Sequence, residues 1–256
     1  MNTQQSIAYT LGATPEVMPY LGRLLADLQA LGSSPSLIVD LLRPLGLPPD
    51  SRVLDLGCGK GAVALEIAQR LGFQVEGVDG FRPFIQAARR RAKRLRLSGL
   101  CRFECADLRD VFRRPETYDV IVLAAIGPVL GDMAQTVGTL RQRVRPGGYL
   151  VLDDGFLDPG EGTVPDSYTA YLPYRETVAQ MTSFGDRVIH ERIFSPDEIR
   201  ATNAAIYAKI RRRAASIIRR HPAAAEAIQE YLRGQEDENL ALETRVRSAL
   251  WVVKIK

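Results

Sequence analysis

The chain has 256 residues, of which 46% are hydrophobic, so it can bury a full core as one large domain or as a domain with an added lid. Its net charge of +4 permits a nucleic-acid partner without strongly indicating one. No apolar run is long enough to span a bilayer, and residues 1–6 lack the features of a signal peptide. Three cysteines and two histidines at spacings unsuited to metal ligands indicate reduced thiols, so we expect a cytoplasmic protein with no bound metal.

Two helices are expected ahead of the first strand. Apolar residues recur with helical spacing from Pro15 to Leu31, and Ser34-Pro35 is a typical start for a second helix that ends before Pro48. These helices either cover the sheet or form one wall of a substrate pocket. The sequence leaves both interpretations open.

A strand, a tight glycine turn and a helix follow. Val53 to Leu56 is an apolar run that contains Asp55, and Ala62 to Leu71 repeats with helical period. Between them lie three glycines at alternate positions, Gly57, Gly59 and Gly61, which are separated by Cys58 and Lys60. Without a Cβ, such a turn can adopt unusual dihedral angles and let a ligand lie against the backbone. The pattern also matches the glycine fingerprint of dinucleotide-binding proteins. Alternatively, the glycines could serve only to pack the helix on the strand.

The second strand, Phe73 to Asp79, ends in an acid about 20 residues beyond the glycines, a spacing at which a carboxylate can reach ribose hydroxyls. Gly80 and Phe81 follow, and an aromatic ring at Phe81 could lie against adenine. Asp79 could instead cap the helix expected over residues 83–96. That helix carries an arginine-rich run, which is usually a solvated face and alternatively a nucleic-acid patch.

The third strand, Cys101 to Cys105, alternates polar and apolar residues and is expected at the sheet edge. It leads to Asp107 and Leu108. An acid at the carboxyl end of a parallel strand faces the same crevice as Asp55 and Asp79, so Asp107 could contact adenine or could be an ordinary loop acid.

The fourth strand, Tyr118 to Ala125, is continuously apolar, as expected at the centre of a parallel sheet. It ends in small residues that leave room for a ligand, Ala124 among them. After a helix around residues 131–144, a Pro-Gly-Gly turn precedes a fifth strand that ends at Asp153 and Asp154.

The rest of the chain is expected to form a long loop over residues 155–173, a short helix over 174–184 and a strand over 187–194. Ser195 begins a long helix that restarts at His221-Pro222, and Gly234 should interrupt or end it. Residues 246–255 form a last strand with Trp251 in the core.

Four motifs in this order, D-L-G-C-G-K-G, V-D-G, A-D-L and R-P-G-G-Y-L, resemble the class I S-adenosylmethionine (SAM) dependent methyltransferases over about residues 50–155. Length and general texture are similar to small-molecule enzymes of the quinone-biosynthesis type. The resemblance implies an α/β, Rossmann-like fold whose seven-stranded, mostly parallel sheet has the order 3-2-1-4-5-7-6, with the last strand antiparallel and helices on both faces. It also implies a helical cap over residues 1–50 and a SAM-binding domain over 51–256 with a loop and helical lid insertion at about 155–245.

By position in the family motifs, the methionine part of SAM would lie on the glycine turn, the ribose at the second strand and the adenine at the third. The residues so assigned are Asp55, Gly57, Cys58, Gly59, Asp79, Gly80, Phe81, Asp107, Leu108 and Ala124. The implied reaction is in-line displacement of the sulfonium methyl group, for which a general base is optional. Candidates for that base are Asp153 and Asp154, with Tyr168, Tyr171, Tyr174 and His190 weaker; His190 is better explained as structural.

The fourth strand lacks the N/D-P-P-Y/F motif of adenine-directed nucleic-acid methyltransferases, so we expect a small-molecule acceptor methylated at O, N or C. Three alternatives stay open: an RNA methyltransferase that uses the arginine-rich helices, a non-catalytic SAM-binding protein, and a nicotinamide dehydrogenase. The protein is expected to be a monomer or a homodimer without a membrane span.

Overall fold

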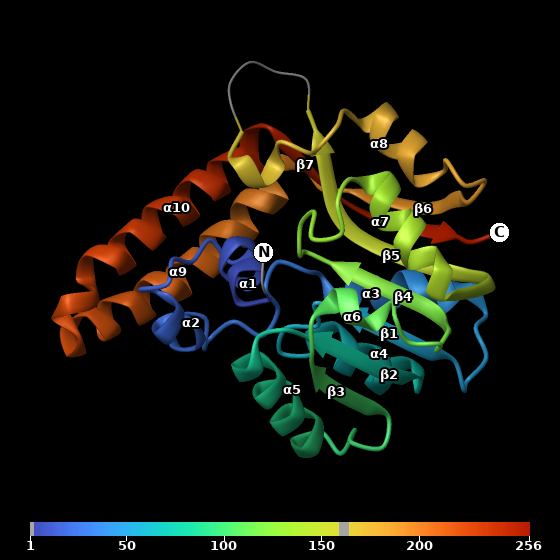
Figure 1. Ribbon diagram of the computed structural model, residues 1–256, viewed down its shortest axis with the longest axis horizontal. Coiled ribbons are helices and arrows are strands. Elements are labelled where there is room, and N and C mark those ends of the chain that lie inside the picture. The colour runs from blue at the N-terminus through green and yellow to red at the C-terminus, as the bar shows by residue number, and fades with distance from the viewer. Residues whose placement is uncertain (1–2, 159–163) are drawn as a thin grey trace.

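The computed structural model describes residues 3–158 and 164–256; residues 1–2 of the N-terminal segment and 159–163 of the expected long loop lie outside the described residues. One seven-stranded sheet forms the centre, in the order β3-β2-β1-β4-β5-β7-β6. Strand β7 alone runs antiparallel to its neighbours β5 and β6. This topology confirms the predicted fold (Figure 1). The strands are β1 Arg52–Leu56, β2 Gln74–Asp79, β3 Cys101–Cys105, β4 Tyr118–Ala124, β5 Val144–Leu157, β6 Arg187–Ile193 and β7 Val246–Lys254.

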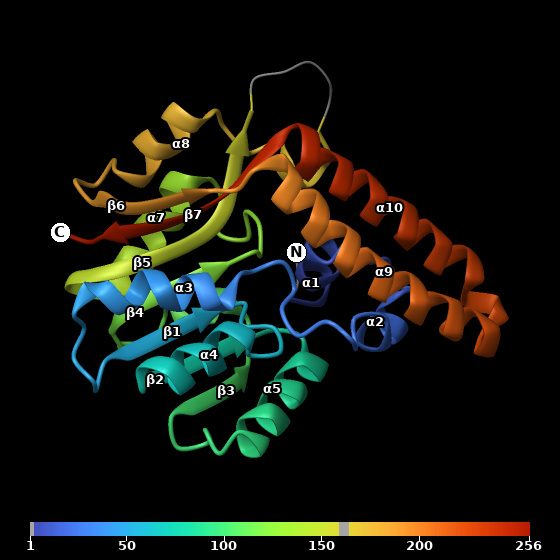
Figure 2. The same ribbon diagram turned by 180° about the vertical axis from the view of Figure 1, so that it is seen from behind.

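Helices cover both faces of the sheet. Helices α3, α4 and α5 pack on one face and α6, α7 and α8 on the other, because alternate strand residues face opposite sides. The two views from opposite sides show these layers (Figures 1 and 2). The helices of the described residues are α1 Thr3–Thr10, α2 Met18–Leu24, α3 Pro35–Leu42, α4 Ala62–Leu71, α5 Arg82–Arg94, α6 Leu108–Val111, α7 Met133–Leu140, α8 Tyr174–Met181, α9 Pro196–Arg220 and α10 Ala225–Thr244.

Helices α9 and α10 form a long antiparallel hairpin that projects beyond the end of the sheet (Figure 2). A capping box of Ser195 and Glu198 begins α9, as predicted. The hairpin packs against α2 and Phe84 of α5 in an apolar cluster separate from those on the sheet. Helices α1 and α2 therefore lie between the hairpin and the carboxyl ends of the strands, whereas α3 packs on the sheet (Figure 2). None of the described helices combines the length and hydropathy needed to cross a bilayer.

Two helix predictions were wrong in extent. The helix expected from Pro15 to Leu31 is helical only over Met18–Leu24, although Leu25 and Leu28 beyond it are buried as expected. The backbone carbonyl groups of Leu25 and Leu28 accept hydrogen bonds from the Lys60 ammonium. This ammonium replaces the backbone N–H donors that a further helical turn would supply. Gly234 neither interrupts nor ends α10, because the helix continues through this residue to Thr244.

The fifth strand is longer than predicted. It continues to Leu157 because its last residues pair with Val246–Ser248 at the start of β7. The expected loop therefore starts at Asp158, and its described end carries a short 3₁₀ turn at Asp166–Tyr168. Strand β6 and α8 lie within the segment 155–245, where an insertion is expected; the division into a cap and a main domain stays a prediction.

Candidate functional site

The turn after β1 has the geometry that its glycines suggested. Gly57, Gly59 and Gly61 have φ values of +68°, +51° and +72°, in the left-handed region that side chains disfavour. A Cβ at Gly57 would lie 2.5 Å from the side chain of Ile126. The turn is fastened to β2, because the N–H groups of Gly57 and Cys58 both donate to the carbonyl oxygen of Val78. These contacts fix the backbone at the carboxyl ends of β1 and β2.

A cavity of about 270 Å³ opens over this turn, between the sheet, the N-terminal segment and the helical hairpin. Nine of the ten residues assigned to a cofactor from the sequence line it: Asp55, Gly57, Cys58, Gly59, Asp79, Gly80, Asp107, Leu108 and Ala124. The strand ends therefore do converge on one space. Phe81 is the exception. Its ring packs edge-on against Phe84, 4.8 Å away, and Phe84 lines the cavity in its place.

Asp55 and Asp79 lie at the ends of β1 and β2, and both line the cavity. Asp55 is only 2% exposed and accepts from the Ala64 N–H at 3.1 Å. Burial, with the nearby charge of Asp79, raises the pKa of Asp55 to about 7. Asp79 accepts from the N–H of Gly59 at 2.9 Å and from the N–H of Phe81 at 2.7 Å, and burial raises its pKa. Asp79 thus braces the glycine turn and the start of α5 while it faces the cavity.

Asp107 and Cys58 have local roles in the structure. Asp107 caps α6 through the Arg109 N–H at 2.9 Å and forms an ion pair with the Arg109 side chain at 2.5 Å. Cys58 is buried, and desolvation with the charge of Asp55 raises the pKa of its thiol well above the usual value. Cys58 therefore stays a neutral thiol that packs in the turn.

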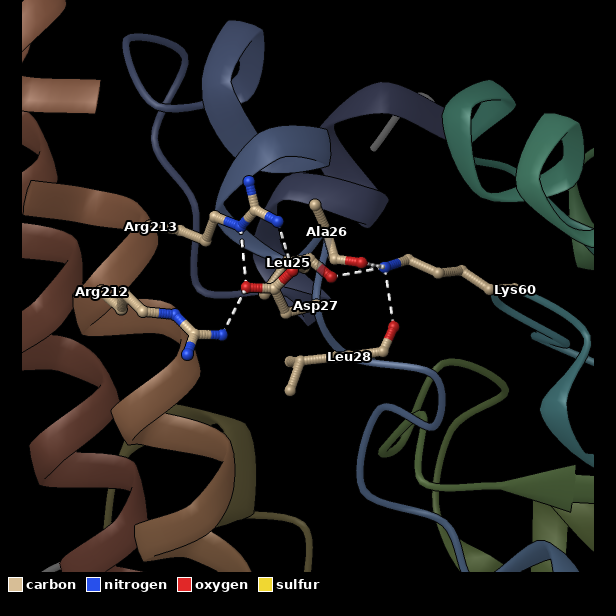
Figure 3. Close-up of polar contacts among 7 residues, drawn as sticks. All are labelled: Leu25, Ala26, Asp27, Leu28, Lys60, Arg212 and Arg213. Carbon is tan, nitrogen blue, oxygen red and sulfur yellow. Dashed lines mark hydrogen bonds and ion pairs between the residues drawn. The ribbon is translucent and has the colours of Figure 1, made fainter. Parts of the chain in front are cut away.

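Lys60, inside the glycine turn, is a residue whose role the motif did not reveal. Its ammonium donates to the backbone carbonyls of Leu25, Ala26 and Leu28, the last at 2.8 Å (Figure 3). Lys60 is 6% exposed, and burial lowers the pKa of its ammonium to about 8. The same segment is held from the other side. Asp27 forms ion pairs with Arg212 and Arg213 of α9, and these guanidinium groups lower its pKa (Figure 3).

A second and larger cavity, of about 850 Å³, lies beside the first. Both cavities are lined by Leu31, Ala125, Ile126, Val129 and Glu238, so they share a wall. Ala125 has a positive φ of 55°, which is uncommon for a residue with a Cβ, and it directly follows β4. Ala125 therefore lies at the boundary between the two cavities. Strained backbone conformations are often found at functional sites.

The candidate bases divide into two groups. Asp153, Asp154, Tyr168 and Tyr171 line the second cavity. His190 and Tyr174 line neither cavity. His190 pairs with Val252 of β7 on the outermost strand β6, far along the sheet from the glycine turn.

Tyr174 packs edge-on against Phe156, and its hydroxyl donates to Glu191 at 3.1 Å. His190 and Tyr174 therefore lie away from both cavities. Their sequence positions had left their place in the fold undetermined.

Buried acids characterise the second cavity. Asp154 accepts from the Tyr171 hydroxyl and from the Gly155 N–H, and burial raises its pKa to about 6. Glu238 of α10 accepts from the Tyr168 hydroxyl at 3.0 Å, and burial raises its pKa as well. Glu238 had no motif to mark it. It reaches the site only because the hairpin folds back over the strand ends.

The arginine-rich helices are used in part to hold the fold together. Arg89 donates twice to the carbonyl oxygen of Phe103, and Arg91 donates to that of Lys60 at 2.9 Å. Arg212 and Arg213 of α9 are bound to Asp27. These four side chains are therefore not fully available to a nucleic acid.

Comparison with known proteins agrees with this geometry. Residues 53–148 match a family described as "Methyltransferase domain". The chain is 28% identical to methyltransferase GfsG of Streptomyces halstedii over 132 residues, which are 52% of this chain and 46% of that protein. It is 32% identical to 2-methyl-6-phytyl-1,4-hydroquinone methyltransferase of Synechocystis over 108 residues, 42% of this chain and 33% of that protein. The matches thus span less than half the length of these two relatives.

The likeness of the fold extends over almost the whole chain. A SAM-dependent methyltransferase from Thiobacillus denitrificans, solved with S-adenosylhomocysteine, superposes with a TM-score of 0.78 at 22% identity. The superposition covers 95% of this chain and 100% of that one. The matched domain lies on the glycine turn and the strand ends that line the first cavity. Residues 53–148 therefore match a methyltransferase domain, and the fold of almost the whole chain is like that of a SAM-dependent methyltransferase.

Proposed function

We propose that the protein binds SAM in the first cavity and transfers its methyl group to a small-molecule acceptor in the second. One observation carries the proposal: the glycine turn and the acids Asp55 and Asp79 line a single cavity that shares a wall with a larger one. That arrangement gives a cofactor and an acceptor separate spaces with a common boundary. The placement within the quinone-biosynthesis type, a location in the cytoplasm and the state of monomer or homodimer stay predictions.

The cavity residues suit the chemical groups of SAM. Asp55 is a buried carboxylate with its pKa raised to about 7, and an ammonium group beside it would compensate the cost of ionising it. Each oxygen of Asp79 has accepted one N–H, which leaves acceptor capacity for a vicinal diol. The positive φ values of Gly57 and Gly59 bring the backbone to the cavity surface. Asp107 and Leu108 also line this cavity, and we assign them to the adenine.

Bound SAM would supply a methyl group on a sulfonium, which is already a good leaving group. The protein residues then act mainly by positioning, because fixed geometry provides a large effective concentration. The glycine turn, the N-terminal segment and the helical hairpin line the cavity and would hold the cofactor between them. Asp153, Asp154, Tyr168 and Tyr171 line the second cavity and would hold the acceptor and receive a proton from it.

A titration with SAM, S-adenosylhomocysteine and NAD tests the proposal. We expect the first two to bind by calorimetry and to raise the thermal midpoint, whereas NAD does neither. At about one hundred times the Kd, a ligand of the folded state adds about 2.7 kcal/mol, or roughly 5–10 °C for a chain of this size. Stabilisation by NAD and not by SAM would instead support a nicotinamide dehydrogenase.

Two further outcomes separate the remaining alternatives. SAM binding without formation of S-adenosylhomocysteine across a broad acceptor panel would indicate a non-catalytic SAM-binding protein. RNA binding that falls steeply with salt would support the RNA methyltransferase, because phosphate contacts release counterions. We expect neither, since the arginines of α5 and α9 named above are bound within the chain.

A further inference from the structure

The second cavity contains far more acid than base. Among its described lining residues, the basic side chain is Arg109, which is bound in the ion pair with Asp107. Carboxyl groups line it from β5, from the 3₁₀ turn and from both helices of the hairpin: Asp153, Asp154, Asp166, Glu198, Asp237 and Glu238. An anionic ligand would be repelled here, and a cationic one would be attracted.

Among the described acids of this cavity, Asp153 is distinguished by a carboxylate oxygen that is fully buried and accepts no hydrogen bond. The side chain is 9% exposed, and its Oδ2 atom is buried without a hydrogen bond. The carboxylate accepts from the backbone N–H of Ser34, and burial together with the charge of Asp154 raises its pKa to about 7. Asp154 and Glu238 by contrast each accept from a tyrosine hydroxyl. An unpaired buried carboxylate oxygen is costly unless a ligand donor satisfies it.

The position of Asp153 links it to the first cavity. In the sheet, Asp153 is the direct neighbour of Ala124, and the Ala125 N–H donates to the Asp153 carbonyl at 2.8 Å. Ala124 lines the first cavity, Asp153 lines the second, and Ala125 lines both. An acceptor atom bound at Asp153 would therefore lie near the boundary across which a methyl group must pass.

Aromatic rings add a second preference for positive charge. Tyr168 and Tyr171 lie edge-to-face with ring centroids 5.2 Å apart, and both line the cavity. Their hydroxyls are bound to Glu238 and Asp154, so the rings are fixed in place. The faces of aromatic rings attract cations, above all where water is excluded.

We propose that the acceptor is an amine that binds in the second cavity as an ammonium ion, and that Asp153 takes the proton that frees the nitrogen lone pair. This inference rests on the proposed function, because SAM is the methyl donor. The amine N–H bond breaks and its proton moves to the carboxylate of Asp153. The N–CH₃ bond then forms as the S–CH₃ bond breaks, and the bonding electron pair stays on sulfur. The product is a methylated ammonium ion with S-adenosylhomocysteine, and Asp153 returns its proton to solvent.

Matched probes test the charge preference. Hexylamine, hexanol and hexanoate form one set, and phenethylamine, phenethyl alcohol and phenylacetate form another. We expect each amine to bind the S-adenosylhomocysteine-loaded protein at least about tenfold more tightly than its matched alcohol and carboxylate, as expected for a hydrogen bond between charged groups. With SAM, the amines should give S-adenosylhomocysteine faster by a similar factor. An alcohol or carboxylate that binds as well as its amine, or the failure of both amines to bind, would overturn the inference.

A substitution links the preference to one carboxylate. Asp153→Asn should lower amine binding and amine methylation by about tenfold or more, while the Kd for SAM changes less than about twofold. Asp50→Asn, at an exposed acid outside both cavities, is the matched control and should change neither. Unchanged amine methylation in Asp153→Asn would contradict the proton-accepting role. If Asp153→Asn does not fold, the probe sets on the unaltered protein still decide the charge preference.

These results are distinguishable from a failure of the proposed function. A protein that binds neither SAM nor S-adenosylhomocysteine overturns both. A protein that binds S-adenosylhomocysteine but shows no preference for amines overturns this inference alone.

Discussion

Asp79 combines two roles in one side chain. Its two oxygens accept from the glycine turn and from the start of α5, so it holds β2, the turn and the helix in a fixed relation. The same carboxylate lines the first cavity. The sequence left helix capping and ribose binding as alternatives, and the geometry allows both because a carboxylate offers about four acceptor sites.

Replacing Asp79 should weaken cofactor binding. We expect Asp79→Ala to cost about 1–3 kcal/mol of SAM binding energy, the usual cost of losing a buried hydrogen-bond partner. Asp79→Asn keeps one oxygen acceptor and should lose less. Calorimetry with SAM measures both, with thermal midpoints to verify folding and Asp50→Ala as the control. Unchanged affinity in Asp79→Ala would exclude this residue from the cofactor site.

The raised pKa of Asp55 predicts how the free energy of unfolding depends on pH. Its pKa is raised to about 7 in the folded state, against the ordinary value of 3.8. Between these values the folded state holds a proton that the unfolded state has lost, so the free energy of unfolding falls as pH rises through this window. Asp153 and Asp154, raised to about 7 and about 6, act in the same direction.

Asp55→Asn should therefore show a smaller loss of stability between about pH 4 and about pH 7 than the unaltered protein. Urea unfolding at several pH values measures the difference. Asp50→Asn, at an exposed surface position, should leave the slope unchanged. Equal slopes in Asp55→Asn and the unaltered protein would mean that Asp55 ionises normally in the folded state.

Among the elements, the short segment between α2 and α3 is the one that joins separate parts of the fold. Lys60 of the glycine turn binds its carbonyls, and Arg212 and Arg213 of α9 bind Asp27 (Figure 3). The segment thus connects the turn beneath the first cavity with the helical hairpin above it. Three carbonyl acceptors and an ammonium donor form charge-assisted bonds, which are stronger than neutral ones.

Removing the ammonium should loosen this segment. Lys60→Met keeps an apolar stem but leaves the carbonyls of Leu25, Ala26 and Leu28 without their donor, so we expect a loss of stability of about 1–3 kcal/mol. Trypsin should then cleave faster after Arg23, at the end of α2. Lys93→Met, at an exposed lysine of α5, is the control. Cleavage at the same rate in Lys60→Met and the control would contradict the anchoring role.

At the scale of the whole molecule, the first cavity is formed by parts distant in the sequence. Residues from α1, the segment after α2, the strand ends, α9 and α10 all line it. A ligand that fills this space must therefore contact the sheet and the helical cover together. Helices α7 and α8 pack on one face of the sheet and strand β6 forms its edge (Figure 1), and none of these three elements lines the first cavity.

Hydrogen exchange tests this arrangement. Adding S-adenosylhomocysteine should slow amide exchange in residues 25–34, 57–62 and in the cavity-lining turns of α9 and α10, because binding lowers the population of locally open states. Peptides from α8 should exchange at the same rate with and without the ligand. Protection confined to residues 57–62 would mean that the hairpin does not close over the cofactor.

Local patterns predicted much of the fold. The strands from β1 to β4, the glycine turn and the cap of α9 could be identified because apolar periodicity, glycine spacing and capping residues act over a few positions. The acids at the strand ends were found for the same reason, since parallel strands bring their carboxyl ends to one edge. The predicted boundaries were wrong where residues distant in the sequence bind the end of an element. Lys60 binds the carbonyl groups beyond α2, and pairing with β7 extends β5.

The order of the motifs along the chain and most of the residues that line the first cavity could be predicted from the amino-acid sequence, because they depend on local spacing. The tertiary structure alone decided that Phe84 and not Phe81 faces the cavity, that His190 lies on the outermost strand, and that Glu238 joins Asp153 and Asp154. Those outcomes depend on the way in which the two long helices fold back over the sheet. They also depend on which buried carboxylates are left without a hydrogen-bond partner. Contacts between residues so far apart leave no periodic trace in the chain.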